Sequence, residues 1–152
     1  MSYEIGDGLF NWIVTNVGNG TILELGSGKG SERLSNARID VHSIEYNPNY
    51  LNLYNTNYYY VPLDGKWFNV SKLERALKTV PNYDLLLVDA PAAFNGDDRM
   101  GYLYNLDLFD NSLVVIDDTH RPSEFILASK VGAKLGRSVI YISDGNKQFA
   151  VI

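Results

Sequence analysis

The stretch from Thr21 to Gly30, Thr-Ile-Leu-Glu-Leu-Gly-Ser-Gly-Lys-Gly, joins a short apolar run to a loop with a glycine at every second position. The apolar run predicts a buried strand, and the residues after it predict the start of a helix. Glycine lets the backbone turn tightly and approach a ligand closely. A helix N-terminus presents free N–H groups to a carboxylate or phosphate. The stretch therefore predicts a strand–loop–helix unit that holds the anionic end of a ligand.

The remainder of the chain repeats this alternation between apolar runs and helix-like stretches. Strands are expected at residues 21–25, 41–45, 58–62, 83–89, 112–117, 138–143 and 148–152. Helices are expected at residues 9–17, 31–37, 48–55, 71–79, 101–109 and 122–135. Ser71 with Glu74 predicts a capping box at the start of the fourth helix. The last helix is expected over residues 122–135, with Ser123 or Arg121-Pro122 marking its start and Gly136 its end.

Two central runs, residues 85–88 and 113–116, are apolar on both faces, which is typical of parallel strands covered by helices on each side. Asp144-Gly145-Asn146 predicts a hairpin between the last two runs, so the final strand should be antiparallel. The predicted fold is α/β: a doubly wound, Rossmann-like, mostly parallel seven-stranded sheet with an antiparallel C-terminal strand and helices on both faces. The length of 152 residues suits a single domain over residues 1–152.

Composition limits the classes of partner. The net charge is −5 and Lys and Arg form no cluster, so a nucleic acid is a disfavoured partner, because phosphate neutralisation dominates that affinity. The chain has no cysteine, so oxygen or histidine ligands would have to hold any metal. We expect a cytoplasmic protein without a membrane partner, since no apolar run approaches the roughly 20 residues of a membrane span and no signal-peptide pattern is seen.

Acidic residues follow four successive predicted strands. They are Glu45, Asp64, Asp89 and the pair Asp117-Asp118. In doubly wound sheets, ligands bind outside the carboxyl ends of the strands. An acid 19 residues after Gly26, in the place of Glu45, can accept both hydroxyls of a ribose. The sequence therefore predicts a nucleoside-containing ligand at this edge.

Two phosphate-binding loops fit the glycine loop poorly. A P-loop needs four residues between its first glycine and Gly-Lys-Ser/Thr, which Gly28-Lys29-Gly30 does not supply. A dinucleotide fingerprint needs glycine or alanine where Ser31 stands.

Residues 22–30 closely resemble the first motif of class I S-adenosylmethionine (SAM)-dependent methyltransferases, in which an acid precedes three alternating glycines. Residues 43–47, 63–65 and 87–91 resemble the second, third and fourth motifs of that family. The resemblance implies that Glu45 holds the SAM ribose, that Asp64 contacts the adenine amino group and that Asp89 lies beside the transferred methyl. The implied SAM-binding residues are Glu24, Gly26, Ser27, Gly28, Gly30, Glu45, Tyr46, Asp64, Gly65 and Asp89.

The charge of the predicted site agrees with that cofactor. SAM carries a sulfonium, an ammonium and a ribose diol, all of which suit carboxylates. A nicotinamide dinucleotide brings two phosphates, which the acids after the strands would repel.

Asp89, Asp117 and Asp118 resemble the acids that hold a divalent ion in cation-dependent O-methyltransferases of catechol-type phenols or macrolide sugars. Oxygen ligands suit Mg²⁺ or Mn²⁺. The resemblance implies an ion that binds the acceptor hydroxyl and lowers its pKa. The match is incomplete, because the phenol-methylating enzymes usually carry a further acid two residues after the first, and residues 90–92 offer none.

The triplet Asp-Ala-Pro at residues 89–91, followed by Arg99 and Met100, resembles plant enzymes that O-methylate glucuronic acid on xylan. That likeness implies that Arg99 grips an acidic or hydroxyl-rich acceptor, since a guanidinium binds carboxylates bidentately. Pairing of Arg99 with Asp97 or Asp98 is an equal alternative. His120 is a candidate general base, or a residue that hydrogen-bonds its neighbours. The candidate catalytic residues are Asp89, Arg99, Asp117 and His120.

Five other side chains are candidates of lower rank. His42 is expected to be structural. Four aromatic side chains could line the adenine or acceptor pocket, although core packing is their default role; they are Trp67, Phe68, Tyr102 and Tyr104.

Three functions remain open. The first is SAM-dependent O-methylation of a small-molecule or carbohydrate acceptor, with or without a divalent metal, and with a homo-oligomer completing an open site. The second is a non-catalytic module that binds SAM or a nucleoside. The third is an aminopropyltransferase-like enzyme, because one fold hosts several chemistries.

Overall fold

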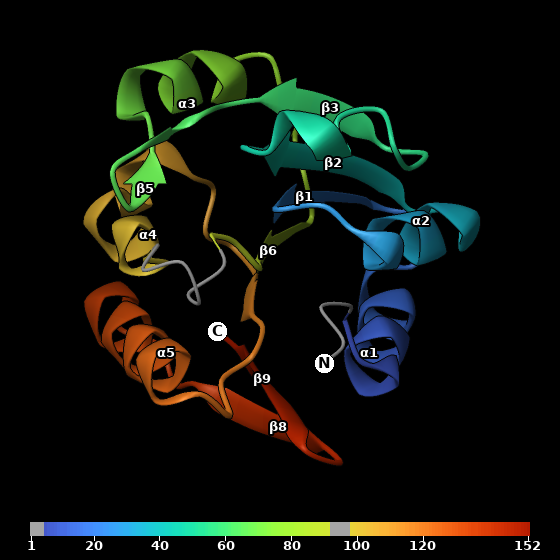
Figure 1. Cartoon of the computed structure of the whole chain (residues 1–152). Helices are drawn as coiled ribbons and strands as arrows, with labels where there is room; N and C mark the ends of the chain where they lie inside the picture. Colours follow the sequence, from blue (N-terminus) through green and yellow to red (C-terminus); the bar gives the residue numbers. More distant parts are fainter. Residues whose placement is uncertain (1–4, 92–97) are drawn as a thin grey trace.

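The computed structural model describes residues 5–91 and 98–152 (Figure 1). Seven strands form one sheet in the order β3-β2-β1-β6-β7-β9-β8. Their bounds are β1 (Thr21–Leu25), β2 (Asp40–Glu45), β3 (Asn57–Tyr60), β6 (Leu85–Val88), β7 (Val114–Ile116), β8 (Ile140–Asp144) and β9 (Lys147–Val151). Neighbouring strands from β3 to β7 are parallel, whereas β9 is antiparallel to both β7 and β8. The predicted fold class is confirmed.

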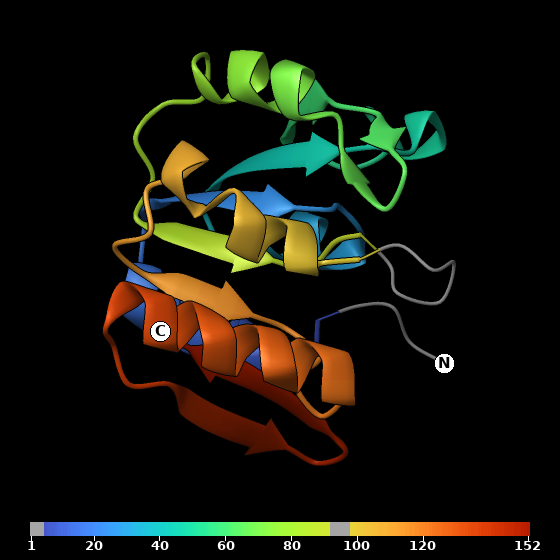
Figure 2. The same ribbon diagram turned by 90° about the vertical axis from the view of Figure 1, so that its left-hand side faces the viewer.

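Helices cover both faces of this sheet. On one side lie α1 (Asp7–Val17) and α2 (Lys29–Asn36), and on the other lie α3 (Val70–Leu77), α4 (Met100–Tyr104) and α5 (Pro122–Leu135). Figure 2 shows α3, α4 and α5 in green, gold and orange, stacked over the second face. None of the helices in residues 5–91 and 98–152 has the length and hydropathy that crossing a membrane requires.

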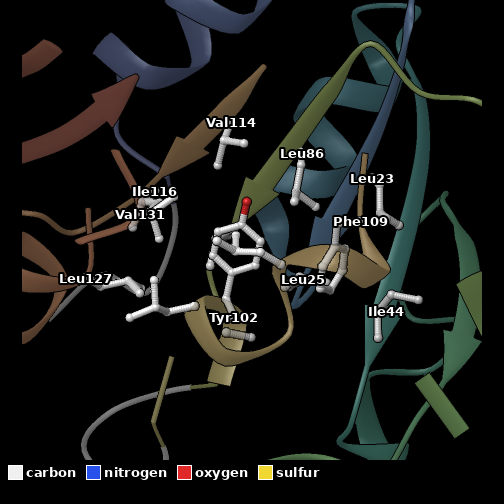
Figure 3. Close-up of a cluster of buried hydrophobic side chains, with 14 of the residues drawn as sticks. Leu23, Leu25, Ile44, Leu86, Tyr102, Phe109, Val114, Ile116, Leu127 and Val131 are labelled. Carbon is white, nitrogen blue, oxygen red and sulfur yellow. The ribbon is translucent and has the colours of Figure 1, made fainter. Parts of the chain in front are cut away.

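The central strands contribute side chains to two hydrophobic cores, one on each face of the sheet, because successive side chains point to opposite faces. On β6, Leu86 and Val88 join the core under α3, α4 and α5, whereas Leu85 and Leu87 join the core under α1 and α2. All four side chains are fully buried. Figure 3 shows the larger core, in which Tyr102 and Phe109 pack with aliphatic side chains of the strands. Burial on both faces explains why these runs lack polar alternation.

The prediction of a helix over residues 48–55 is wrong. Only a 3₁₀ turn, η1 (Pro48–Tyr50), forms there. The side chain of Asn47 accepts a hydrogen bond from the Asn49 amide at 3.0 Å, and Asn52 has a φ of 60°. Asparagine side chains compete with the helix for backbone hydrogen bonds. The density of asparagine in this stretch therefore stops the helix after one turn.

Other element boundaries also differ from the sequence predictions. The predicted capping box of Ser71 with Glu74 is wrong, because α3 begins earlier and the Asn69 side chain accepts from the Lys72 amide at 3.0 Å. The helix predicted over residues 101–109 is divided into α4 and a 3₁₀ turn, η3 (Leu106–Leu108). A small hairpin, β4 (Leu63–Asp64) with β5 (Trp67–Phe68), was not predicted. The predicted limits of the last helix are confirmed: α5 begins at Pro122, and Gly136 ends it in the left-handed conformation.

Candidate functional site

The glycine loop lies at the carboxyl edge of the sheet, between β1 and α2. Gly26 has a φ of +90°, and a Cβ there would lie 2.7 Å from the Cβ of Ala90. The Gly26 amide donates to the carbonyl of Ile44 at 2.8 Å. Glycine is therefore required at this position, because the loop after β1 presses against both β2 and the segment after β6.

The other two glycines of the loop have different surroundings. A Cβ at Gly30 would lie 2.8 Å from Cγ1 of Ile5, so this glycine permits close packing of the chain's own residues. A Cβ at Gly28 would meet nothing within 4 Å. The Gly28 amide donates to Oγ of Ser31 at 3.0 Å. Of the three glycines, Gly28 is the one that borders open space.

Glu45, the acid at the end of β2, is oriented by the glycine loop. Its Oε1 accepts from the Ser27 amide at 3.1 Å and from the Ser27 hydroxyl at 2.6 Å. Its Oε2 accepts from the Asn47 amide at 2.9 Å. Glu45 is buried. The glycine loop and the second-strand acid, which were each predicted to bind the same ligand, are thus joined by direct hydrogen bonds.

Glu24 lies beneath the loop. Its Oε1 accepts from the hydroxyl of Ser43 at 2.5 Å and also from that of Ser31. Burial raises the pKa of Glu24 to about 7, against the opposing effect of the two serine hydrogen bonds. Because the carboxyl is turned toward Ser31 and Ser43, its visible role is to fix the start of α2.

Asp89, directly after β6, contacts Arg99, which directly precedes α4. Nη2 of Arg99 lies 3.4 Å from Oδ1 of Asp89 and 3.3 Å from Oδ2 of Asp118. Arg99 also donates through Nε to the carbonyl of Pro91 at 3.0 Å. Burial, and then the carboxylate of Asp117, raise the pKa of Asp89, while Arg99 acts in the opposite direction. The guanidinium therefore joins the ends of β6 and β7.

The three carboxylates expected to act together do lie together. One oxygen from each of Asp89, Asp117 and Asp118 falls within 4.8 Å of the other two. Oδ1 of Asp117 accepts from the Asp118 amide at 2.8 Å. Burial, followed by the Asp118 carboxylate, raises the pKa of Asp117 to about 6. Three acids therefore meet beside one guanidinium at the carboxyl ends of β6 and β7.

The remaining predicted site residues occupy more open positions. Tyr46 is half-buried and packs edge-to-face on Phe68, with ring centroids 6.1 Å apart. Asp64 and Gly65 are exposed in the β4–β5 hairpin. His120 is exposed in the turn between β7 and α5.

Side-chain contacts exclude one of the two partners considered for Arg99 and show the surroundings of His42. Arg99 does not pair with Asp98, whose Oδ1 accepts from the Met100 amide at 2.7 Å; Asp97 lies outside the described residues. His42 is structural as predicted, because its ring nitrogens contact the Tyr59 hydroxyl and the Asp40 carboxylate, each at 2.9 Å.

Three of the four aromatic candidates belong to the core. Trp67, Phe68 and Tyr102 are buried, and the Tyr102 hydroxyl donates to Oδ1 of Asn111 at 2.5 Å. Tyr104 is exposed instead.

Sequence reasoning missed several groups that complete the site. The amide of Asn47 and the carbonyl of Pro91 are main-chain groups, so no side-chain pattern could reveal them. The serine hydroxyls that hold Glu24 carried one signal: Ser43 points inward from a buried strand, where a polar side chain requires a partner.

Among comparisons with known proteins, only the comparison with solved structures finds matches, and it agrees with this architecture. No known protein-family model matches the sequence, and no curated protein matches it. Solved structures do share the fold. MycE, a methyltransferase of the mycinamycin biosynthetic pathway in complex with Mg and S-adenosylhomocysteine (SAH), aligns over 94% of this chain at 15% identity and a TM-score of 0.53. This chain spans 46% of the MycE chain.

Two other solved structures align with this chain over most of their own length as well. SAH-bound PaMTH1 of Podospora anserina aligns over 98% of this chain and 79% of its own, at 16% identity and a TM-score of 0.57. A Staphylococcus aureus protein, assigned as a caffeoyl-CoA O-methyltransferase, aligns over 96% and 81%, at 17% identity and a TM-score of 0.56. The fold is that of the class I SAM-dependent methyltransferases, as the motifs predicted.

Proposed function

We propose that this protein is a SAM-dependent methyltransferase that acts on a hydroxyl oxygen of a small or sugar-like acceptor. The observation that carries the proposal is the direct contact between Ser27 of the glycine loop and the buried carboxylate of Glu45. The Glu45 carboxylate can accept hydrogen bonds from both hydroxyls of the SAM ribose. The N–H groups at the start of α2 can bind the carboxylate of SAM. The SAH-bound neighbours with the same fold support the choice of cofactor.

The chain's own residues divide the work of binding. Glu45 would accept hydrogen bonds from the ribose hydroxyls, which would replace its present hydrogen bond from the Ser27 hydroxyl. The space beside Gly28 would admit the anionic end of the cofactor near the start of α2. Tyr46 and the hairpin residues Asp64 and Gly65 would border the adenine. Asp89, at the end of β6, would lie toward the cationic sulfur.

Methyl transfer to a hydroxyl releases a proton, and Asp89 is the best placed carboxylate to accept it. SAM supplies a methyl group on a sulfonium, so an acceptor oxygen can displace SAH in one in-line step. The Asp89 side chain is 22% exposed, against 9% for Asp118. A raised pKa makes Asp89 a stronger proton acceptor than an ordinary aspartate. His120 is the alternative base, because it lies exposed in the adjoining turn.

Mg²⁺ or Mn²⁺ on Asp89, Asp117 and Asp118 is the other arrangement that the acids suggest. Their oxygens are close enough to be gathered by one ion. However, Oδ1 of Asp89 and Oδ2 of Asp118 already share one nitrogen of Arg99. A divalent ion held by all three acids fits poorly beside that fixed cation, because like charges repel. We therefore derive no catalytic step through a metal.

Turnover of radiolabelled SAM tests this proposal. The protein should transfer label to at least one member of a panel of hydroxylated sugars and phenols, and Glu45→Ala should abolish that transfer. Glu32→Ala is the matched control, because Glu32 is an exposed acid on α2. Binding of SAM without label transfer to any acceptor would favour a non-catalytic module. Turnover only with decarboxylated SAM would favour an aminopropyltransferase.

A further inference from the structure

We propose that the guanidinium of Arg99 is the resident cation of the acidic site and takes the place of the divalent ion that the three aspartates would otherwise hold. Its role is to position Asp89 and Asp118, and methyl transfer then needs no divalent metal. The role in methyl transfer rests on the proposed function, whereas the claim about metal binding does not.

The first support is the position of the guanidinium between the two strand ends. Nη2 of Arg99 lies within 3.4 Å of both Asp89 Oδ1 and Asp118 Oδ2, and Nη1 lies 3.3 Å from the same Asp118 oxygen. Mg²⁺ requires oxygens at about 2.0–2.1 Å in near-octahedral geometry. An ion sharing these two oxygens would have to displace the guanidinium or lie against its positive charge.

The second support is that Arg99 is anchored by main-chain atoms as well as by carboxylates. Nε donates to the Pro91 carbonyl at 3.0 Å, Nη1 to the Asp117 carbonyl at 3.3 Å and Nη2 to the Asp89 carbonyl at 3.2 Å. The residue is only 5% exposed. Together with the carboxylate contacts, these bonds engage all three guanidinium nitrogens. The Arg99 side chain is therefore held by main-chain carbonyls after both β6 and β7.

The backbone that carries Arg99 is fixed as well. Oδ1 of Asp98 accepts from the Met100 amide at 2.7 Å, and the Asp98 amide donates to the carbonyl of Lys66 at 2.8 Å. Two residues further, Gly101 packs so tightly on Trp67 that a Cβ would lie 2.2 Å from the indole ring. Arg99 is thus held between the β4–β5 hairpin and the acids, so it cannot swing away without moving α4.

The third support is the balance of charge. Nη1 of Arg121 lies 3.6 Å from Oδ2 of Asp118, so this oxygen faces a second cation. The positive charge of Lys147 acts on Asp117. Arg99 and Arg121 therefore contact the aspartates directly and Lys147 acts on Asp117 electrostatically, while Glu24 and Glu124 add negative charge nearby. The two arginines at Asp89 and Asp118 lower the electrostatic attraction that would recruit a divalent ion.

Titration of the SAM-free 152-residue chain with MnCl₂ tests the proposal, with binding measured by calorimetry and by the EPR signal of free Mn²⁺. The wild type should show no stoichiometric binding at millimolar Mn²⁺. Arg99→Ala should gain a Mn²⁺ site, with affinity raised roughly tenfold or more, and adding Asp118→Asn should remove it. Arg75→Ala, at an exposed arginine of α3, should behave as the wild type.

Several results would overturn the proposal. Stoichiometric Mn²⁺ binding by the wild type that disappears in Asp118→Asn would show that the aspartates hold a metal beside Arg99. A folded Arg99→Ala that gains no Mn²⁺ site would also contradict it, and if Arg99→Ala fails to fold, the wild-type titration decides. SAM binding is measured in a separate experiment. Its absence would contradict the proposed function but would not affect the conclusion about Mn²⁺ binding.

Discussion

At the scale of single residues, Glu24 shows how a buried carboxyl links pH to stability. Its pKa rises from 4.5 to about 7 because burial disfavours the charged form. The folded state therefore binds this proton more tightly than the unfolded state. Its stabilising contribution is complete below pH 4.5 and is lost as the pH rises through about 7.

We therefore predict that Glu24 lowers the free energy of unfolding by on the order of 3 kcal/mol as the pH rises from 4.5 to about 7. Urea denaturation at several pH values measures it. Glu24→Gln should flatten the slope, whereas Glu32→Gln at an exposed position should leave it unchanged. An equal slope in Glu24→Gln and wild type would show that Glu24 is ionised in the fold.

The two glycines at positions 26 and 28 should respond differently to the same added methyl group. Gly26→Ala places a Cβ 2.7 Å from Ala90 at a positive φ, so it should destabilise the protein by roughly 1–3 kcal/mol. Gly28→Ala adds a methyl in open space at an extended φ, so stability should change little.

Chemical denaturation and SAM calorimetry separate the two effects. Gly28→Ala should weaken SAM binding while the protein remains folded, because its methyl would occupy the space proposed for the cofactor. Unchanged SAM affinity in Gly28→Ala would contradict the placement of the cofactor beside this residue.

At the scale of elements, the start of α3 offers a direct comparison between the predicted cap and the observed one. The Asn69 side chain accepts from the Lys72 amide, so Asn69→Ala should lower stability by about 1 kcal/mol. Ser71→Ala should be close to neutral, because Ser71 lies inside the helix. Urea midpoints of the two variants measure the difference, and a larger loss for Ser71→Ala would restore the predicted capping box.

The elements that the sequence predicts well are those with a strong periodic signal. The apolar runs at 85–88 and 113–116 identify buried parallel strands, and Asp144-Gly145-Asn146 identifies the reversal before β9. The hairpin of β4 and β5 has only two residues in each strand, which is too short for any periodicity. The failed helix at 48–55 depended on side-chain hydrogen bonds of asparagine, which hydrophobic patterning ignores.

At the scale of the whole molecule, topology explains how much of the site the sequence could predict. Parallel strands bring their carboxyl ends to one edge, so the acids after four predicted strands were expected to gather there. Of these acids, Asp64 lies exposed in the β4–β5 hairpin. Glu45 beside the glycine loop and the cluster of three aspartates confirm that grouping. The contacts of Arg99 depend on how close the residues after β6 lie to those after β7, and no sequence pattern within either segment predicts this proximity.

The central claim is that this edge binds SAM, and calorimetric titration of the 152-residue chain with SAM and SAH tests it most directly. The account predicts micromolar binding of both, no heat with NAD, loss of binding in Glu45→Ala with the fold retained, and wild-type affinity in Glu32→Ala. Absence of binding by the folded wild type, or undiminished binding in Glu45→Ala, would contradict it.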